Sequence, residues 1–274
     1  MTPERTHRAV SRDGTEIVAH VHGDGQPLVL VSGSGDGQND PFLLPQLSEH
    51  FTCYSLSLRG HGLSEASTDQ APERHVEDIA AIVESVGDPV RVAAYSRGAG
   101  LALSAVAESK AVQAVALYEP HVIELYGAED VPRAEAALER MQAATDQGHL
   151  AEAAKVFFEE ITLPNPRELA LLSESGAFDS ISPIMPDIVT EVSQWKLPRP
   201  SDSLPLAGIN VPVLLLHGSD SHQFYRGVVE HLSAHLPNAD SHEVAESGHF
   251  GPWFNPAPIA ERIVQFFGAG TEPR

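Results

Sequence analysis

Ser96 is the residue of this sequence best placed to act as a nucleophile. It follows an apolar run at residues 90 to 95 and begins a run of small residues with helical spacing. A strand that turns sharply into a helix projects the serine hydroxyl above the sheet, and needs small residues two positions before and after that serine. Ala94 and Gly98 occupy those positions. The segment predicts a nucleophile elbow, and a plain strand-to-helix turn is the competing interpretation.

A serine hydroxyl is a poor nucleophile at neutral pH, so this chemistry needs a general base, a group that orients the base, and donors for an oxyanion. His249 is the candidate base among the 14 histidines, because it directly follows the last predicted strand. Open α/β sheets place their sites at that edge. The backbone amides of Ser34 and Arg97 are the candidate oxyanion donors.

The glycine-rich loop around Ser34 has a second interpretation as a phosphate or dinucleotide loop. No long helix follows it directly, and no acidic ribose partner ends the next strand in the expected way. These absences disfavour nucleotide binding. His231 and His235 share a helix face four residues apart, but no glutamate completes a zinc-protease motif, so a polar surface pair is favoured over a metal site. We expect neither a metal nor a cofactor.

The pattern of strands and helices predicts a sheet that would hold these residues at one edge. Apolar segments that are hydrophobic throughout, such as residues 211 to 216, are typical of parallel strands covered on both faces. Residues 23 to 26 have the composition of a hairpin turn between the first two predicted strands. Strands are expected near 15–21, 27–31, 52–57, 90–95, 111–118, 211–217 and 240–245, with helices near 72–87, 97–108, 222–236 and 256–268.

Residues 121 to 205 interrupt this alternation and predict a helical insertion. They have helical spacing at 131–146, 149–161 and 166–174, and a proline-rich segment near 197–205 leads the chain back to the sheet. Apolar side chains at such spacing are usually packing residues, although some can line a pocket beneath a cap. The large ones here are Phe157, Phe158, Phe178, Met185 and Trp195.

Charge and cysteine content limit the classes of partner. The 274 residues include 17 Lys and Arg against 38 Asp and Glu, a formal net charge of −21. This charge repels phosphate backbones and anionic membranes, so nucleic-acid and membrane partners are not expected. Cys53 is the only cysteine, which excludes an intrachain disulfide. No apolar run approaches the roughly 20 residues of a spanning helix, so a cytoplasmic location is expected.

The chain resembles the α/β-hydrolase superfamily over nearly its whole length. The residues that carry the resemblance are Ser32-Gly33-Ser34-Gly35, Arg59-Gly60-His61-Gly62-Leu63-Ser64, Ala94-Tyr95-Ser96-Arg97-Gly98, His217-Gly218 and Gly248-His249. The resemblance implies a mostly parallel eight-stranded sheet with helices on both faces and a helical cap inserted after the sixth strand. The expected core is then residues 1–120 and 206–274, and the expected cap is residues 121–205.

The resemblance leaves two candidates for the acid that orients His249. In most of the superfamily the acid follows the seventh strand, three residues after a glycine, where this chain has Ser221, with Asp220 one place early. In some branches the acid follows the sixth strand, where this chain has Glu119. Glu119 is preferred and Asp220 stays open. Departures from the family pattern are Ser32 for histidine, Ser57 for aspartate and Ala94 for glycine.

We therefore expect a serine hydrolase acting on an ester, lactone or similar acyl bond of a small molecule, as a monomer or homodimer. Other chemistries on the same frame, namely C–C bond hydrolysis, perhydrolysis or a biosynthetic cyclisation, remain alternatives, as does a non-catalytic ligand receptor. For His61, a structural role within its turn is the favoured interpretation. The residues expected to contact substrate are Gly33, Tyr95, His121, Trp195 and Phe250.

Overall fold

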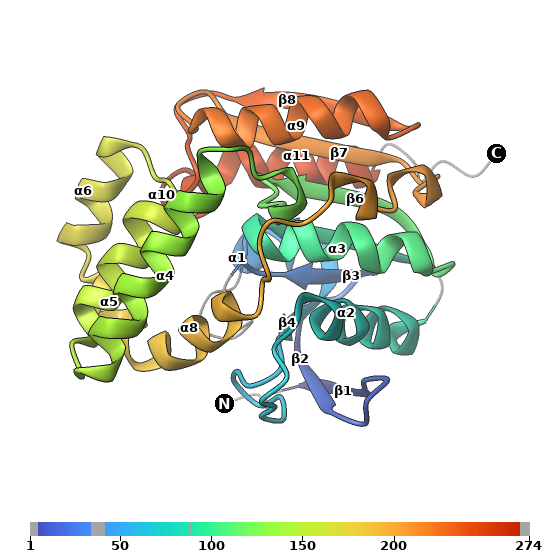
Figure 1. Ribbon diagram of the computed structural model, residues 1–274. Helices are drawn as coiled ribbons and strands as arrows, with labels where there is room; N and C mark the ends of the chain where they lie inside the picture. Colours follow the sequence, from blue (N-terminus) through green and yellow to red (C-terminus); the bar gives the residue numbers. More distant parts are fainter. Residues whose placement is uncertain (1–4, 34–41, 88, 269–274) are drawn as a thin grey trace.

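The computed structural model describes residues 5–33, 42–87 and 89–268, and within them eight strands form one sheet in the order β1-β2-β4-β3-β5-β6-β7-β8 (Figure 1). Neighbouring strands from β4 onward along this order are parallel, and β1–β2 and β2–β4 are antiparallel. The strands are β1 (Thr6–Val10), β2 (Glu16–His22), β3 (Gln26–Val31), β4 (Phe51–Ser57), β5 (Val90–Tyr95), β6 (Val112–Tyr118), β7 (Val213–Gly218) and β8 (Ala239–Val244).

The first part of the sheet differs from the sequence prediction in two ways. Strand β1 was not predicted, because its first three residues are polar and only Ala9 is buried in it, at the edge of the sheet. The predicted hairpin between β2 and β3 is wrong, because β4 lies between these two strands and pairs with both. The turn at residues 23–26 therefore carries the chain past β4, and the pairing that separates β2 from β3 is a tertiary contact.

Helices cover both faces of the sheet, as predicted. Along β3 the side chains alternate: Val29 and Val31 pack in the apolar cluster of α2, α3 and α9, whereas Leu28 and Leu30 pack in that of α1 and α11. Burial on both faces explains why the central strands are apolar throughout. The helices are α1 (Leu44–Leu47), α2 (Pro72–Val86), α3 (Ser96–Glu108), α9 (Gln223–His235), α10 (Gly251–Phe254) and α11 (Pro256–Gly268).

The chain between β6 and β7 is a helical insertion with an apolar core of its own. Figure 1 shows its helices gathered at one end of the sheet, beside the start of α3. Met141, Phe158 and Met185 are buried there, and Phe250 from the loop after β8 joins the same cluster. The insertion contains α4 (Asp130–Asp146), α5 (Leu150–Val156), the π-helical turn η2 (Phe157–Ile161), α6 (Pro166–Glu174), α7 (Ala177–Ile181), α8 (Met185–Ser193) and short 3-10 turns at Ile123–Leu125, Ser182–Ile184, Ser201–Ser203 and Leu206–Gly208.

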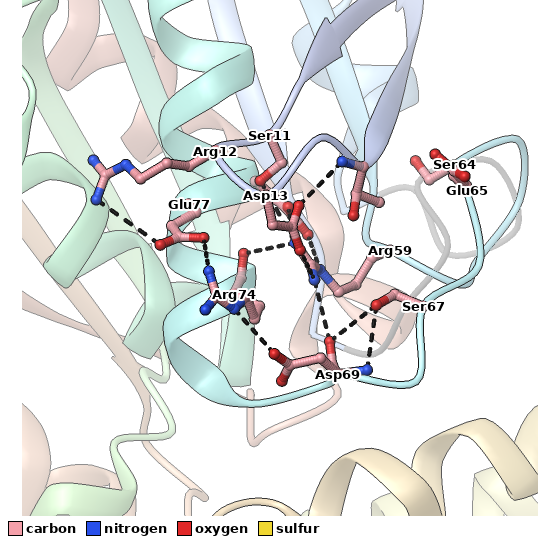
Figure 2. A network of polar contacts seen from close by, with 12 residues as sticks. Ser11, Arg12, Asp13, Arg59, Ser64, Glu65, Ser67, Asp69, Arg74 and Glu77 are labelled. Atoms are coloured by element: carbon pink, nitrogen blue, oxygen red, sulfur yellow. Dashed lines mark hydrogen bonds and ion pairs between the residues drawn. The ribbon is translucent and has the colours of Figure 1, made fainter.

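A buried arginine fixes the turn after β4. The guanidinium of Arg59, fully buried, donates two hydrogen bonds to Asp78 of α2 at 2.8 and 2.7 Å and one to Asp13 at 2.9 Å. Figure 2 shows this network continuing through Asp69 and Arg74 on the surface of the turn. A buried bidentate pair holds its partners in one geometry. Arg59 therefore ties the β1–β2 turn, the turn after β4 and helix α2 together.

Candidate active site

Ser96 occupies a sharp turn between β5 and α3, with a left-handed backbone at φ 53°. A side chain at Gly98 would place its Cβ 2.2 Å from the carbonyl oxygen of Ser32, so only glycine fits the helix this close to β3. Ala94, which stands where the family pattern has glycine, lies fully buried in the sheet and pairs with Val31. The elbow geometry follows from these packing limits.

His249 lies on the loop after β8 and contacts Ser96 directly. The distance from Ser96 Oγ to His249 Nε2 is 2.9 Å. The Tyr95 hydroxyl donates to the carbonyl oxygen of His249 at 2.9 Å, and the Tyr118 hydroxyl donates to that of Gly248 at 2.6 Å. The two tyrosines end strands β5 and β6. The backbone of the histidine loop is thereby bonded to the edge of the sheet.

Tyr225 of α9 packs against the imidazole of His249. The two rings are stacked with centroids 4.3 Å apart and planes at 10°. The Tyr225 hydroxyl donates to the carbonyl oxygen of Thr162 at 2.9 Å and lies 3.3 Å from His249 Nε2. Because its proton is engaged by Thr162, the hydroxyl oxygen can accept a hydrogen bond from a protonated Nε2. Tyr225 therefore restricts the ring plane and supports the imidazolium form.

Glu119 follows β6 and contacts the other nitrogen of His249. Its Oε2 lies 3.1 Å from His249 Nδ1, and its Oε1 accepts the Gly218 N–H at 3.0 Å and the Ser221 hydroxyl. The carboxylate is fully buried, and its backbone φ of 45° is left-handed. With Glu119 as acceptor, Nδ1 carries the proton and Nε2 presents a lone pair to Ser96. This arrangement has the hydrogen-bonding order of a Ser-His-acid triad.

Burial sets the protonation states of this pair. Removal from water raises the pKa of Glu119 to about 7, opposed by hydrogen bonds from Ser221 and Gly218. Burial also lowers the pKa of His249 to about 3. Near pH 8 the pair is therefore an ionised carboxylate beside a neutral imidazole, which is the form that a general base requires.

A cavity of about 300 Å³ opens beside Ser96 and His249. One side is formed by the sheet edge, including Gly33 and Tyr95, and the other by the helical insertion, which contributes mostly apolar side chains. At about 30 Å³ per water molecule, the space equals roughly ten waters, so it fits a small or medium organic group. The other lining residues are Phe157, Phe158, Thr162, Ser175, Ala177, Ser180, Ile181, Ile184, Phe250 and Trp253.

Arg97 places its two polar parts in different surroundings. Its position in the first turn of α3 leaves its backbone N–H without an intrahelical acceptor, as an oxyanion donor requires. Its buried guanidinium pairs through Nε with Glu191 of α8 at 2.6 Å, and Nη1 and Nη2 have no hydrogen-bond partner among the residues that the structure describes. Arg97 and Ser96 both line a niche of about 20 Å³. Ser34, the other predicted oxyanion donor, lies outside the described residues.

The remaining predicted residues divide between the cavity and its surroundings. Gly33, Tyr95 and Phe250 line the 300 Å³ cavity. His121 and Trp195 instead line the niche behind Ser96 and a groove on its far side. The His121 N–H donates to the Ser96 carbonyl oxygen at 2.9 Å, and burial lowers the pKa of its imidazole to about 3. Both residues therefore support the site from behind.

Asp220 is exposed on the loop after β7, where its carboxylate accepts the Ser219 hydroxyl. Ser221, one position further, points inward to Glu119, so the position at which most of the superfamily has its acid carries a hydrogen-bond donor to a different carboxylate.

His231 and His235 stack on each other on α9, and no cluster of three metal-ligating side chains occurs among the residues that the structure describes.

Sequence reasoning gave no role in this site to three residues: Tyr225, Ser221 and Glu168. Tyr225 belongs to no motif, and Ser221 was considered only as the position where most of the superfamily has its acid; the folded chain brings them to His249 and Glu119. Glu168 had a signal, because Asn165 and Glu168 have the spacing of a capping box that begins a helix. That spacing locates the helix start but says nothing of the loop that carries His249, which Glu168 contacts through the Phe250 N–H.

Comparison with known families agrees with this geometry. The model of the alpha/beta hydrolase family matches residues 28–262. The chain belongs to the alpha/beta hydrolase family. Its eight-stranded, mostly parallel sheet is the expected one for that family, and a search of curated protein sequences finds no significant match.

Solved structures of other alpha/beta hydrolases have the same fold. One from Sphaerobacter thermophilus is 27% identical, with a TM-score of 0.75 over 95% of this chain and 100% of that one. An esterase from Exiguobacterium antarcticum is 18% identical, with a TM-score of 0.78 over 95% and 98% of the two chains. A bromoperoxidase from Bacillus anthracis is 18% identical, with a TM-score of 0.77 over 96% and 100%.

Within the described residues, no helix has the length and apolar character needed to cross a membrane.

Proposed function

We propose that this protein is a serine hydrolase that cleaves an ester, lactone or similar acyl bond through the triad Ser96, His249 and Glu119. The observation that carries the proposal is the pair of hydrogen bonds from Ser96 Oγ to His249 Nε2, 2.9 Å, and from His249 Nδ1 to Glu119 Oε2, 3.1 Å. Serine, imidazole and carboxylate in this order activate a hydroxyl for attack on a carbonyl carbon.

In the first half of the reaction Ser96 Oγ attacks the carbonyl carbon while His249 Nε2 takes the hydroxyl proton. The Arg97 N–H stabilises the oxyanion, with a second donor proposed at Ser34. Collapse of the tetrahedral intermediate breaks the bond to the leaving alcohol, which receives the proton from His249. In the second half a water attacks the acyl-enzyme, His249 again carries the proton, and Ser96 Oγ leaves with it. The products are the acid and the alcohol.

The cavity supports a small or medium acyl substrate. Its lining is largely aromatic and aliphatic around the polar edge formed by Ser96 and His249, so an apolar acyl or alcohol group fits there while the reacting carbonyl lies at that edge. The esterase from Exiguobacterium antarcticum fits this proposal, and at 18% identity it establishes the shared fold alone.

The test is labelling with a fluorophosphonate, read by intact mass and peptide mapping, together with turnover of p-nitrophenyl esters. The parent protein is expected to gain one adduct at Ser96, and Ser96→Ala is expected to lose both labelling and turnover while its circular dichroism is unchanged. No labelling of the folded parent would refute the activated serine and favour a ligand receptor. Labelling without ester turnover, but with turnover of organic acid and peroxide or of a vinylogous diketone, would favour the alternative chemistries on the same frame.

A further inference from the structure

Glu168 is a buried carboxylate that the triad does not use. It lies in the first turn of α6, in the helical insertion, and is 4% exposed. Its Oε1 accepts the Phe250 N–H at 2.7 Å, and its Oε2 packs so closely on Gly248 that a Cβ added there would lie 2.5 Å from it. Gly248 and Phe250 are the two neighbours of His249 in the chain. One carboxylate from the insertion therefore contacts the backbone on both sides of the candidate base.

The same residue also caps its own helix. The side chain of Asn165 accepts the Glu168 N–H at 2.9 Å, and Glu168 Oε2 accepts the Asn165 N–H at 3.3 Å, which completes a capping box. A capping box normally satisfies donors of its own helix only. Here the box extends to two loops of the sheet edge, because Asn165 Nδ2 also donates to the Asp220 carbonyl oxygen at 3.4 Å. The start of α6 is thus joined to the loops after β7 and β8.

These bonds complete the support of the histidine loop. Tyr118 and Tyr95 hold the carbonyl oxygens of Gly248 and His249 from the sheet, and Glu168 holds the Phe250 amide of the same loop from the insertion. The imidazole must keep both of its short contacts at once for the reaction to proceed. A displacement of about 1 Å can cost as much as 100-fold in rate. Loss of the Phe250 amide contact would therefore reduce the alignment of His249 with Ser96.

The charge of Glu168 matters because each of its two carboxylate oxygens accepts a hydrogen bond from a backbone amide. Burial raises the pKa of Glu168 to about 7; the amides of Asn165, Phe250 and Gly248 oppose this rise, and Glu119 adds to it. Two further titratable groups interact with it, the hydroxyls of Tyr118 and Tyr225, whose own pKa values burial raises well above 10. Above about pH 7 both oxygens of Glu168 are acceptors. Below it, a proton takes one acceptor position from the loop.

We propose that Glu168 is a positioning residue for His249, acting from the helical insertion through the backbone of residues 248–250 without contact to the substrate. The expected effect on the reaction rate rests on the proposed hydrolase function. The expected effect on the position of the imidazole does not depend on any substrate. Through Glu168 the insertion helps to position the catalytic histidine. The insertion also forms one wall of the cavity.

The test compares Glu168→Gln with Glu174→Gln, which removes a carboxylate from the exposed end of the same helix. Glutamine keeps the shape but must turn its NH₂ group toward one of the amides. We expect kcat of Glu168→Gln for a p-nitrophenyl ester to fall at least tenfold at pH 8, with KM within twofold of the parent. The deficit should shrink toward pH 6, because the parent then carries a proton on Glu168 as well. Glu174→Gln should match the parent at every pH.

A second readout, the ¹⁵N and ¹H shifts of the His249 ring, does not depend on turnover. A changed shift in Glu168→Gln and none in Glu174→Gln would support the positioning role even if the parent hydrolyses no ester, an outcome that would refute only the proposed function. Unchanged shifts, a kcat equal to the parent's, or a deficit that is the same at all pH values would overturn the positioning role. If Glu168→Gln does not fold, Glu168→Asp, which keeps the charge on a shorter side chain, must lose kcat at pH 8 with KM unchanged, and full activity would overturn the proposal.

Discussion

The substitution Glu119→Gln tests which carboxylate orients His249. Glu119 Oε1 accepts two donors, the Gly218 N–H and the Ser221 hydroxyl, so in the variant the amide oxygen is expected to take that position. The NH₂ group then faces His249 Nδ1 and donates to it. An Nδ1 that accepts a hydrogen bond leaves the ring proton on Nε2, where it points at Ser96 Oγ. The imidazole is then the wrong tautomer to take the serine proton.

The size of the effect follows from that tautomer change. Replacing the triad acid by its amide costs on the order of 10⁴ in kcat where the geometry is otherwise kept. Each factor of ten equals 1.36 kcal/mol of activation free energy, so a loss of 10³ to 10⁴ is roughly 4 to 5.5 kcal/mol. Glutamine has nearly the shape of glutamate, so we expect the Ser96–His249 distance and the cavity to be kept and KM to change little. The matched control is Asp220→Asn, which removes an exposed carboxylate from the neighbouring loop and should alter kcat less than twofold.

The assay is steady-state hydrolysis of a p-nitrophenyl ester by the parent and both variants from pH 5.5 to 8.5. Burial raises the pKa of Glu119 to about 7, so the parent's carboxylate takes up a proton as the pH falls through 7 and His249 loses its acceptor. The rate should therefore rise from pH 5.5 to 8 in the parent and in Asp220→Asn. If Glu119→Gln stays within tenfold of the parent while Asp220→Asn loses more than 100-fold, the assignment of Glu119 is refuted and the acid belongs at position 220.

Two further predictions concern stability and the cavity. Asp78→Asn should lower the free energy of unfolding by about 3–5 kcal/mol in urea titrations, because it leaves the buried Arg59 without its bidentate partner. The control, Asp69→Asn at the half-exposed end of the network, should lower it by under about 1 kcal/mol. Equal losses in the two variants would contradict this reasoning. Ala177→Phe should fill part of the 300 Å³ cavity. It should reduce kcat/KM for octanoyl esters about tenfold or more relative to acetyl esters, because each methylene group that can no longer be buried costs ~0.8 kcal/mol. An unchanged dependence on acyl chain length would place the acyl group elsewhere.

The sequence by itself determined the elements of the core and the two residues with the clearest local signals. Apolar runs without alternation identified the central strands, because a parallel sheet buried on both faces leaves no polar side. Ser96 and His249 were identifiable because each lies in a short segment with a defined chain geometry, a strand-to-helix turn and the loop after the last strand. Local sequence is sufficient for such features, since the required small residues are close along the chain.

The tertiary structure decided what depends on contacts between distant segments. The pairing of β2 with β4, in place of the predicted hairpin with β3, depends on a strand about 30 residues further along the chain. Glu119 and Asp220 are both carboxylates after a strand, and only the packing of β6 against β7 turns Glu119 inward and leaves Asp220 exposed. Tyr225 and Glu168 reach His249 because α9 and α6 pack beside its loop. The direction in which a side chain points at a strand end is set by those neighbours and has no local sequence signature.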